Sequence, residues 1–98
     1  MADFRIDYDK VISQANTICS LADELSRQIR KLEDLRTVMN NGWEGPASSV
    51  FRQKLNSLIA EMESTYSSMN SVASTIKTTA KRIKREDERL AREAQILA

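Results

Sequence analysis

The rarest residue types in this 98-residue sequence limit its chemistry before any pattern is considered. The sequence contains no histidine and one cysteine, so an intrachain disulfide and a cysteine–histidine zinc site are both excluded. The usual general base of a catalytic triad is missing as well, and no glycine-rich loop is present to hold a phosphate group. We therefore expect a protein that is not an enzyme, with no catalytic residue, no cofactor and no metal site.

Long apolar runs are absent too. No stretch approaches the roughly 18 apolar residues of a membrane-spanning helix, and the charged start lacks the apolar centre of a cleavable signal peptide. With 15 basic and 14 acidic residues, the net charge of +1 gives no strong attraction for nucleic acid. These features predict no nucleic-acid partner and no stable membrane insertion, and conventional rules place the protein in the cytoplasm.

Residues that interrupt helices are confined to one place. Both glycines and the single proline fall within residues 42–46. Gly42 suits the left-handed position just past the end of a helix, and Pro46 suits the first position of the next helix. The segment therefore reads as the end of one helix, a tight turn and the start of another.

The predicted boundaries follow from this turn. We expect helix 1 over about residues 7–40, a turn over 41–46 and helix 2 over about 46–95. Asp3 or Asp7 is expected to cap helix 1. A chain of 98 residues is short enough to form a single domain.

Apolar or small residues recur along the first segment at intervals of three and four, the spacing of a helix that packs against another helix. The row consists of Tyr8, Val11, Ala15, Ile18, Ala22, Leu25, Ile29, Leu32 and Met39. Arg36 interrupts the row. Cys19 lies beside it and is expected to act as a small apolar residue, with an intermolecular disulfide across a dimer axis as the alternative.

A second row of this kind follows the turn and is longer. It consists of Phe51, Leu55, Leu58, Met62, Tyr66, Met69, Ala73, Ile76, Ala80 and Ile83, and it continues through Asp87 to Leu97. Asp87 is the one charged member. From Ser64 to Thr79 the segment is rich in serine, threonine and asparagine, which indicates either a seam of small residues for close helix approach or a solvated face.

A connection this short between two long helices implies antiparallel neighbours, so we predict an all-α helical hairpin in which the two rows pack. Helix 2 outruns helix 1, and from about Ala80 onward it has no partner in its own hairpin. The apolar stripes are wide enough to leave Ile12, Leu21, Phe51 and Ile59 partly exposed. A second hairpin docked antiparallel would cover them, so we expect dimerisation into an elongated four-helix bundle.

Basic residues gather near the end of helix 2, at Lys77, Lys81, Arg82, Lys84, Arg85, Arg89 and Arg92. Such a run is typical of a nucleic-acid or anionic-lipid contact, or of a solvated helix face. Glu86, Glu88 and Glu93 are interleaved with it. Arg89 and Glu93 have the spacing of an ion pair on a helix, and no aromatic residue is present to stack on bases. We favour the solvated face.

Trp43-Glu44-Gly45 lies in the turn, midway along a chain of about one hundred residues with a long helix on either side. In these features the whole chain resembles the WXG-motif family, the early-secreted-antigen-like proteins of type VII secretion systems. The resemblance implies that the secretion machinery recognises this turn. Gly45 lets the backbone bend and approach closely at the start of helix 2. Trp43 covers the tip of the hairpin, stands exposed as a contact, or does both.

The family often carries a second export element after helix 2, a tyrosine followed four residues later by an acid, placed near the partner's turn in an antiparallel dimer. This chain lacks that element, because Tyr66 is followed by Asn70 and no tyrosine comes later. A looser family pattern has a hydrophobic residue, an acid four residues on, and hydrophobic residues three and seven beyond the acid. The residues with this spacing, and hence the candidate C-terminal export pattern, are Ile83, Asp87, Leu90 and Ala94.

The resemblance implies a small non-enzymatic protein exported by a Gram-positive type VII secretion system and acting through protein–protein contacts, as an adaptor or partner of larger secreted effectors. The implied partners are the secretion ATPase and its machinery, a larger toxin, and a second copy of the chain or a related WXG protein; the balanced charge favours the homodimer. The implied location is cytoplasmic before export, then extracellular or at the cell surface, without a conventional signal peptide. The alternative is a cytoplasmic helical adaptor or chaperone of a secreted effector that is not itself exported.

Overall fold

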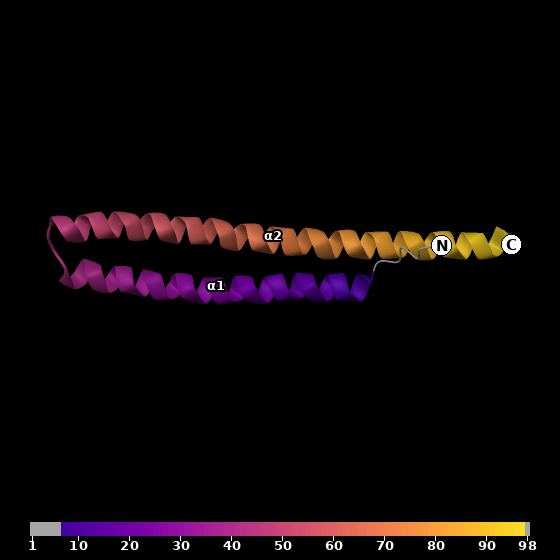
Figure 1. Cartoon of the computed structure of the whole chain (residues 1–98), viewed down its shortest axis with the longest axis horizontal. Helices are drawn as coiled ribbons and strands as arrows, with labels where there is room; N and C mark the ends of the chain where they lie inside the picture. The colour runs from indigo at the N-terminus through magenta and orange to yellow at the C-terminus, as the bar shows by residue number, and fades with distance from the viewer. Residues whose placement is uncertain (1–6, 98) are drawn as a thin grey trace.

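Two helices joined by a tight turn make up residues 7–97, the part of the chain that the computed structural model describes (Figure 1). Helix α1 spans Tyr8–Gly42 and helix α2 spans Pro46–Leu97. The helices lie side by side and antiparallel, and residues 7–97 contain no strand, so the predicted all-α helical hairpin is confirmed. Each helix ends two residues beyond its predicted boundary. The pairing of two hairpins and the assignment of the whole chain to one domain stay predictions.

Both helices begin as the sequence predicted. Asp7 caps α1: its backbone is extended (φ −78°, ψ 90°), and its Oδ1 accepts a hydrogen bond from the Lys10 backbone N–H at 3.0 Å. The other candidate cap, Asp3, lies outside the described residues. Pro46 is the first residue of α2, where its missing N–H costs no helical hydrogen bond.

The end of α1 differs from the prediction. Gly42 is the last helical residue, and the positive φ lies three residues later, at Gly45. The helix ends because Trp43 is extended (φ −126°, ψ 117°), although its N–H still donates to the Met39 carbonyl at 3.0 Å. The prediction of a left-handed Gly42 is therefore wrong, because the chain makes its reversal after Trp43 and not before it.

The face of α1 that contacts α2 follows the row found in the sequence. Its buried residues are Ala15, Ala22, Ile29 and Met39, and its half-buried ones include Tyr8, Val11, Ile18, Leu25 and Leu32. Arg36, which interrupts the row, is half-buried, and its Nη1 donates to Asn56 Oδ1 on α2 at 3.0 Å. The arginine stem covers apolar surface while its charged head reaches a polar partner, so the interruption does not open the contact face.

The contact face of α2 is offset from the predicted row near the turn. Ile59 is only 3% exposed, whereas Leu58 and Phe51 are each 45% exposed. The expectation that Ile59 would be partly exposed is therefore wrong. The predicted row contains two successive intervals of four, from Leu58 to Met62 and on to Tyr66. Strict alternation of three and four, counted back from Met62, keeps Leu55 in the contact and replaces Leu58 with Ile59. Leu58 and Phe51 lie outside the contact between α1 and α2.

The buried residues differ between the two halves of the hairpin. In the turn half (residues 25–66) they form a cluster of large side chains: Ile29, Met39, Leu55 and Ile59, with Leu25, Leu32, Met62 and Tyr66 packed against it. In the open half (residues 8–24 and 67–87) the buried residues are Ala15, Ala22, Ala73 and Ala80. Alanine lets helices approach closely but removes less apolar surface from water than leucine or isoleucine.

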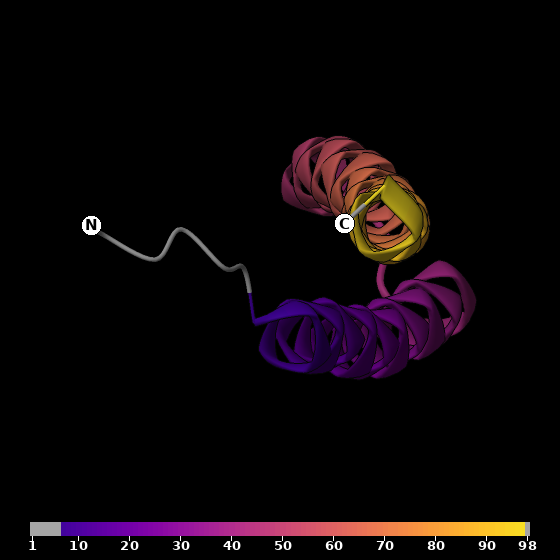
Figure 2. The ribbon, with the colours of Figure 1, turned by 90° about the vertical axis from the view of Figure 1, so that its right-hand side faces the viewer.

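Helix α2 is the longer one, with 52 residues against 35, and it extends past α1 at the open end (Figure 1). At about 1.5 Å per residue it measures about 78 Å, which matches the longest dimension of the molecule, 79 Å. Helix α1 still covers Ala80, which is 6% exposed, and reaches Asp87 through Tyr8. The overhang thus begins after Asp87 and not at about Ala80. Viewed along the rod, the helices cross instead of running strictly parallel (Figure 2).

Candidate functional site

The Trp43-Glu44-Gly45 turn depends on one unusual backbone conformation. Gly45 has a φ of 115°, which L side chains rarely adopt. A Cβ added there would meet no heavy atom within 4 Å, so the backbone angle and not a close contact requires glycine. The predicted bend is present and the predicted close approach is wrong. Helix α2 starts at once, with the Ser49 N–H donating to the Gly45 carbonyl at 3.2 Å.

Ser48 fixes the backbone of Trp43 from the first turn of α2. Its side chain is fully buried, and its hydroxyl donates to the Trp43 carbonyl at 2.9 Å. A buried hydroxyl needs such a partner, because leaving it unbonded would cost free energy. Ser48 was not among the residues predicted from the sequence. The signal that locates it is its place seven residues before Leu55, in the corrected register of the contact face.

The Trp43 ring packs against Phe51 at the tip of the hairpin and remains accessible. The two ring centroids are 5.8 Å apart and the ring planes are inclined by 51°, a favourable aromatic arrangement. Trp43 is 43% exposed and Glu44 is exposed as well. The turn therefore presents an indole ring, an adjacent phenyl ring and a carboxylate at one end of the molecule.

Two arginine–asparagine hydrogen bonds hold the helices together near this end. Arg52 Nη1 on α2 donates to Asn40 Oδ1 on α1 at 3.3 Å, and Arg36 on α1 makes the opposite bond to Asn56 on α2. Because each helix supplies one donor and one acceptor, sliding of one helix along the other would break both bonds. The aromatic pair is thus presented on a fixed support.

The candidate C-terminal pattern lies on α2 where α1 begins. Ile83 is 38% exposed and Leu90 is 50% exposed, and Asp87 and Ala94 are exposed too. The Asp87 carboxylate is not bare, since its Oδ2 accepts a hydrogen bond from the Tyr8 hydroxyl on α1. This bond gives a physical reason why the row tolerates a charged residue at that position.

Tyr8 has a role beyond its predicted place as the first member of the α1 row. The hydrogen bond to Asp87 is the largest cause that raises the pKa of the Tyr8 hydroxyl above 10.0, followed by burial and the charges of Asp87 and Glu88. Tyr8 therefore stays protonated, and stays a donor, throughout the neutral range. No local motif pairs these residues; only the antiparallel fold brings them together.

The two candidate elements lie far apart in one chain. The turn occupies one end of the rod, and the Ile83–Ala94 segment lies near the other end (Figure 1). A single hairpin therefore does not bring the Trp43 ring to the Asp87 carboxylate. Any receptor that reads both elements in one chain must span most of the rod.

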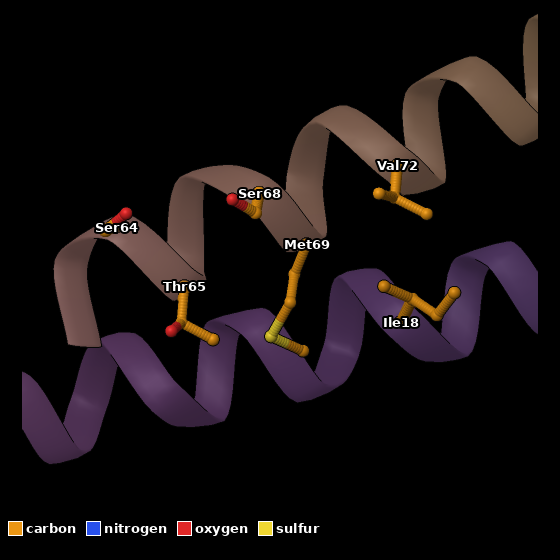
Figure 3. Close-up of a pocket in the computed structure, with 6 residues that line it drawn as sticks. All are labelled: Ile18, Ser64, Thr65, Ser68, Met69 and Val72. Atoms are coloured by element: carbon orange, nitrogen blue, oxygen red, sulfur yellow. The ribbon is translucent and has the colours of Figure 1, made fainter. Parts of the chain in front are cut away.

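A shallow groove of about 430 Å³ runs between the helices in their middle part (Figure 3). Its lining residues are Ile18, Ser64, Thr65, Ser68, Met69 and Val72. Met69 points from α2 toward α1, whereas Ser64 and Ser68 are exposed. Of the two interpretations of the serine-rich segment, the structure supports the solvated face, because its serines do not lie in the contact between the helices.

The basic run near the end of α2 is partly neutralised. Arg89 forms ion pairs with Glu93 at 2.5 Å and with Glu86, and the latter bond lowers the pKa of the Glu86 carboxyl. In the open half, Lys77 Nζ donates to Asn16 Oδ1 at 3.2 Å and lies 3.9 Å from the Sγ of the half-buried Cys19. Lys77 thus serves as a tie between the helices and not as a free cation.

Within residues 7–97, no helix is both long enough and apolar enough to cross a membrane. The chain matches no curated protein and no solved structure. The family described as proteins of 100 residues with WXG (WXG100) does match, over residues 3–88. Since this match covers most of the chain, including α1, the turn and α2 as far as residue 88, the protein belongs to the WXG100 family, whose members are small type VII secretion substrates.

Proposed function

We propose that this protein is exported by a Gram-positive type VII secretion system as an antiparallel homodimer and acts through protein–protein contacts, without catalysis, as a partner of larger secreted effectors. Family membership supports the export route. The single observation that carries the dimer is a second apolar row on α2, distinct from the row that contacts α1. A heterodimer with a related WXG protein is the competing arrangement.

The second row consists of residues seven apart on α2, namely Phe51, Leu58, Thr65 and Val72. Phe51 and Leu58 are each 45% exposed and Val72 is 51% exposed. Seven-residue spacing keeps side chains on one face of a helix, the pattern of helices that pack together lengthwise. Thr65 and Val72 also line the groove beside Ile18. A helix with two such rows is suited to a four-helix bundle, in which each helix contacts two neighbours.

An antiparallel arrangement also resolves the separation of the two candidate export elements. A two-fold axis across the rod places the turn of one copy near the open end of the other. Trp43 of one protomer and Asp87 of its partner would then form one surface for the secretion ATPase. A parallel dimer would leave the two elements at opposite ends, as in a single hairpin.

The dimer is tested with a charge in the second row. We expect wild-type protein to show about twice the chain mass of 11.1 kDa in light scattering. The Leu58→Glu variant should run as a monomer with its helix content retained, because Leu58 is 45% exposed and lies outside the contact between α1 and α2. Ala60→Glu, two residues away on another face of α2 and already exposed, is the matched control and should remain dimeric. A monomeric wild type would overturn the homodimer and favour the related-partner arrangement.

Export is tested in cells with an active type VII system by measuring the protein in medium and in lysate. Trp43→Ala should lower the amount in the medium while leaving helix content unchanged, because the ring packs only at the tip. Val38→Ala changes a more exposed apolar residue near the same end and should be exported normally. A wild-type protein found only in the lysate would overturn export and support the cytoplasmic adaptor or chaperone.

A further inference from the structure

The open end of the hairpin holds a contact that the export proposal does not use. The Tyr8 hydroxyl at the start of α1 donates to Asp87 Oδ2 on α2, across 79 positions of sequence. Neither residue lies in the turn half or in its apolar cluster. We propose that Tyr8 is a positioning residue for export, which holds the Asp87 carboxylate in the orientation that the secretion machinery binds; this inference rests on the proposed function.

The hydrogen bond from Tyr8 restricts the side-chain conformation of Asp87. An exposed aspartate on a helix samples several rotamers, and holding it in one of them costs conformational entropy when a partner binds. A hydrogen bond from Tyr8 removes part of that freedom before binding. The tyrosine ring is itself held in the contact face of α1, because Tyr8 is half-buried. The acid is therefore pre-organised by a side chain that the hairpin fixes.

The hydrogen bond from Tyr8 leaves the second carboxylate oxygen of Asp87, Oδ1, available. Tyr8 bonds to Oδ2, and among residues 7–97 no basic side chain lies within 4.0 Å of the Asp87 carboxylate. A carboxylate accepts several hydrogen bonds, so Oδ1 remains open to a donor from outside. Glu86, the neighbouring acid, is instead bonded to Arg89. Tyr8 thus orients the Asp87 carboxylate through Oδ2, and Oδ1 is left to accept a hydrogen bond from a partner.

The surface beside the Tyr8–Asp87 contact is hollowed and largely apolar. A shallow cavity of about 310 Å³ lies next to this contact, and its lining residues are Tyr8, Val11, Thr75, Ile76, Thr79, Ala80 and Ile83. Tyr8 belongs to both the cavity wall and the hydrogen bond. A segment that presents an apolar side chain next to a lysine, arginine or backbone N–H would fit both features. We assign that chemistry to the part of the export machinery that reads Asp87.

The test compares single-atom changes in the full-length protein. Tyr8→Phe removes the hydroxyl and keeps the ring as a cavity wall, and Asp87→Asn removes the charge and keeps the shape. Tyr66→Phe is the matched control, because the Tyr66 hydroxyl makes no side-chain hydrogen bond within the described residues. The amount of protein in medium relative to lysate is measured for each variant, together with helix content and melting temperature.

We expect Tyr8→Phe and Asp87→Asn to lower export by about threefold to tenfold, the range for loss of one ordinary hydrogen bond that is exposed to water. The double variant should be exported no worse than the more impaired single variant, since both changes remove the same interaction. Tyr66→Phe should be exported like wild type. The export loss of Tyr8→Phe should persist at a low temperature at which it is as helical as wild type.

The contact itself is checked by an absorbance titration of the tyrosines in the Tyr66→Phe background. Tyr8 should ionise above its ordinary pKa of 10.0, and Asp87→Asn should bring the pKa back toward that value. Because the pKa of Tyr8 is raised in the folded protein, the contact is intact below about pH 10 and is lost as the pH rises through the pKa of folded Tyr8. An unchanged pKa in Asp87→Asn would overturn the contact.

The outcomes separate this inference from the export proposal. Normal export of Tyr8→Phe together with impaired export of Asp87→Asn would overturn the role of Tyr8 and leave the C-terminal pattern in place. Normal export of both variants would remove Asp87 from the export signal, and with it the role of Tyr8. A Tyr8→Phe defect that vanishes at low temperature would show a purely stabilising residue and overturn positioning. Failure of wild-type export would overturn the proposed function instead.

Discussion

The turn half and the open half of this hairpin have the same two helices but different means of holding them together. The turn half buries isoleucine, leucine and methionine, whereas the open half buries four alanines. Polar hydrogen bonds join the helices in both halves, from Lys77 to Asn16 and from Tyr8 to Asp87 in the open half and between arginine and asparagine in the turn half, so the open half depends on them more. Apolar burial contributes about 25 cal/mol per Å², so most of the stability within one chain resides in the turn half.

The difference fits the way each end presents its candidate element. The Trp43–Phe51 pair stands on the well-packed half, supported by Ser48 and by the arginine–asparagine bonds. Asp87 stands on the half with thin packing, where a single tyrosine hydroxyl holds it. A partner would meet a surface ordered by apolar packing at one end and a surface whose order depends on one hydrogen bond at the other, because regions with few buried apolar contacts open at lower free energy.

The largest expected effect compares two isoleucines on α2. Ile59→Ala in the turn half should lower the free energy of unfolding by about 2–5 kcal/mol, the usual cost of emptying a buried isoleucine site. Ile76→Ala in the open half should cost about half as much or less, because Ile76 is only half-buried. Urea unfolding followed by circular dichroism at one protein concentration measures both. Equal losses would contradict the uneven distribution of stability.

Ile59 also shows where sequence reasoning succeeded and where it failed. The α1 row was read correctly, because its apolar residues alternate strictly at three and four from Tyr8 to Leu32. On α2, Leu58 and Ile59 are adjacent and both apolar, so periodicity near Met62 allowed two registers. The predicted row correctly contained Leu55, but it included Phe51 and Leu58 and left out Ile59. Phe51 and Leu58 belong to the second row.

The candidate sites were predictable to different degrees. The turn was found because glycine, proline and tryptophan are rare and occur together there. The angle at Gly45 could not be distinguished from one at Gly42 without coordinates, since either glycine tolerates a positive φ. The Tyr8–Asp87 contact joins opposite ends of the sequence, and no spacing rule relates them. Only the length of α1 and the register between the helices bring these two side chains together.

The next effect in size separates the two glycines of the turn end. Gly45→Ala should destabilise the hairpin by about 1–3 kcal/mol, since a φ of 115° is strained for alanine even though the space is open. Gly42→Ala should instead be neutral or stabilise by up to about 1 kcal/mol, because Gly42 is helical and alanine favours helix. Melting temperatures of the two variants should move in opposite directions. A lower melting temperature in both variants would indicate that Gly42 also has a positive φ and would contradict its helical conformation.

The smallest effect concerns the last part of α2, beyond the cover of α1. The bond from Arg89 lowers the pKa of Glu86 below its ordinary value of 4.5, so the ionised carboxylate stabilises this part of the helix above that value. The stabilisation is lost as the pH falls through the lower pKa of the folded state. Carbon-13 chemical shifts of residues 84–93 should therefore report a loss of helix between about pH 7 and about pH 2, while the turn half changes less.

Glu86→Gln should remove most of that acid-dependent loss, because glutamine carries no charge to titrate, and added salt should weaken the wild-type effect by screening. Glu88→Gln is the matched control: Glu88 is two residues away and forms no ion pair within residues 7–97. Its variant should keep the wild-type acid response. An equal response in the two variants would show that general charge balance, and not the Glu86–Arg89 bond, stabilises this part of the helix. The polar contacts of Tyr8 and Lys77 would then be the specific ones that stabilise the open end.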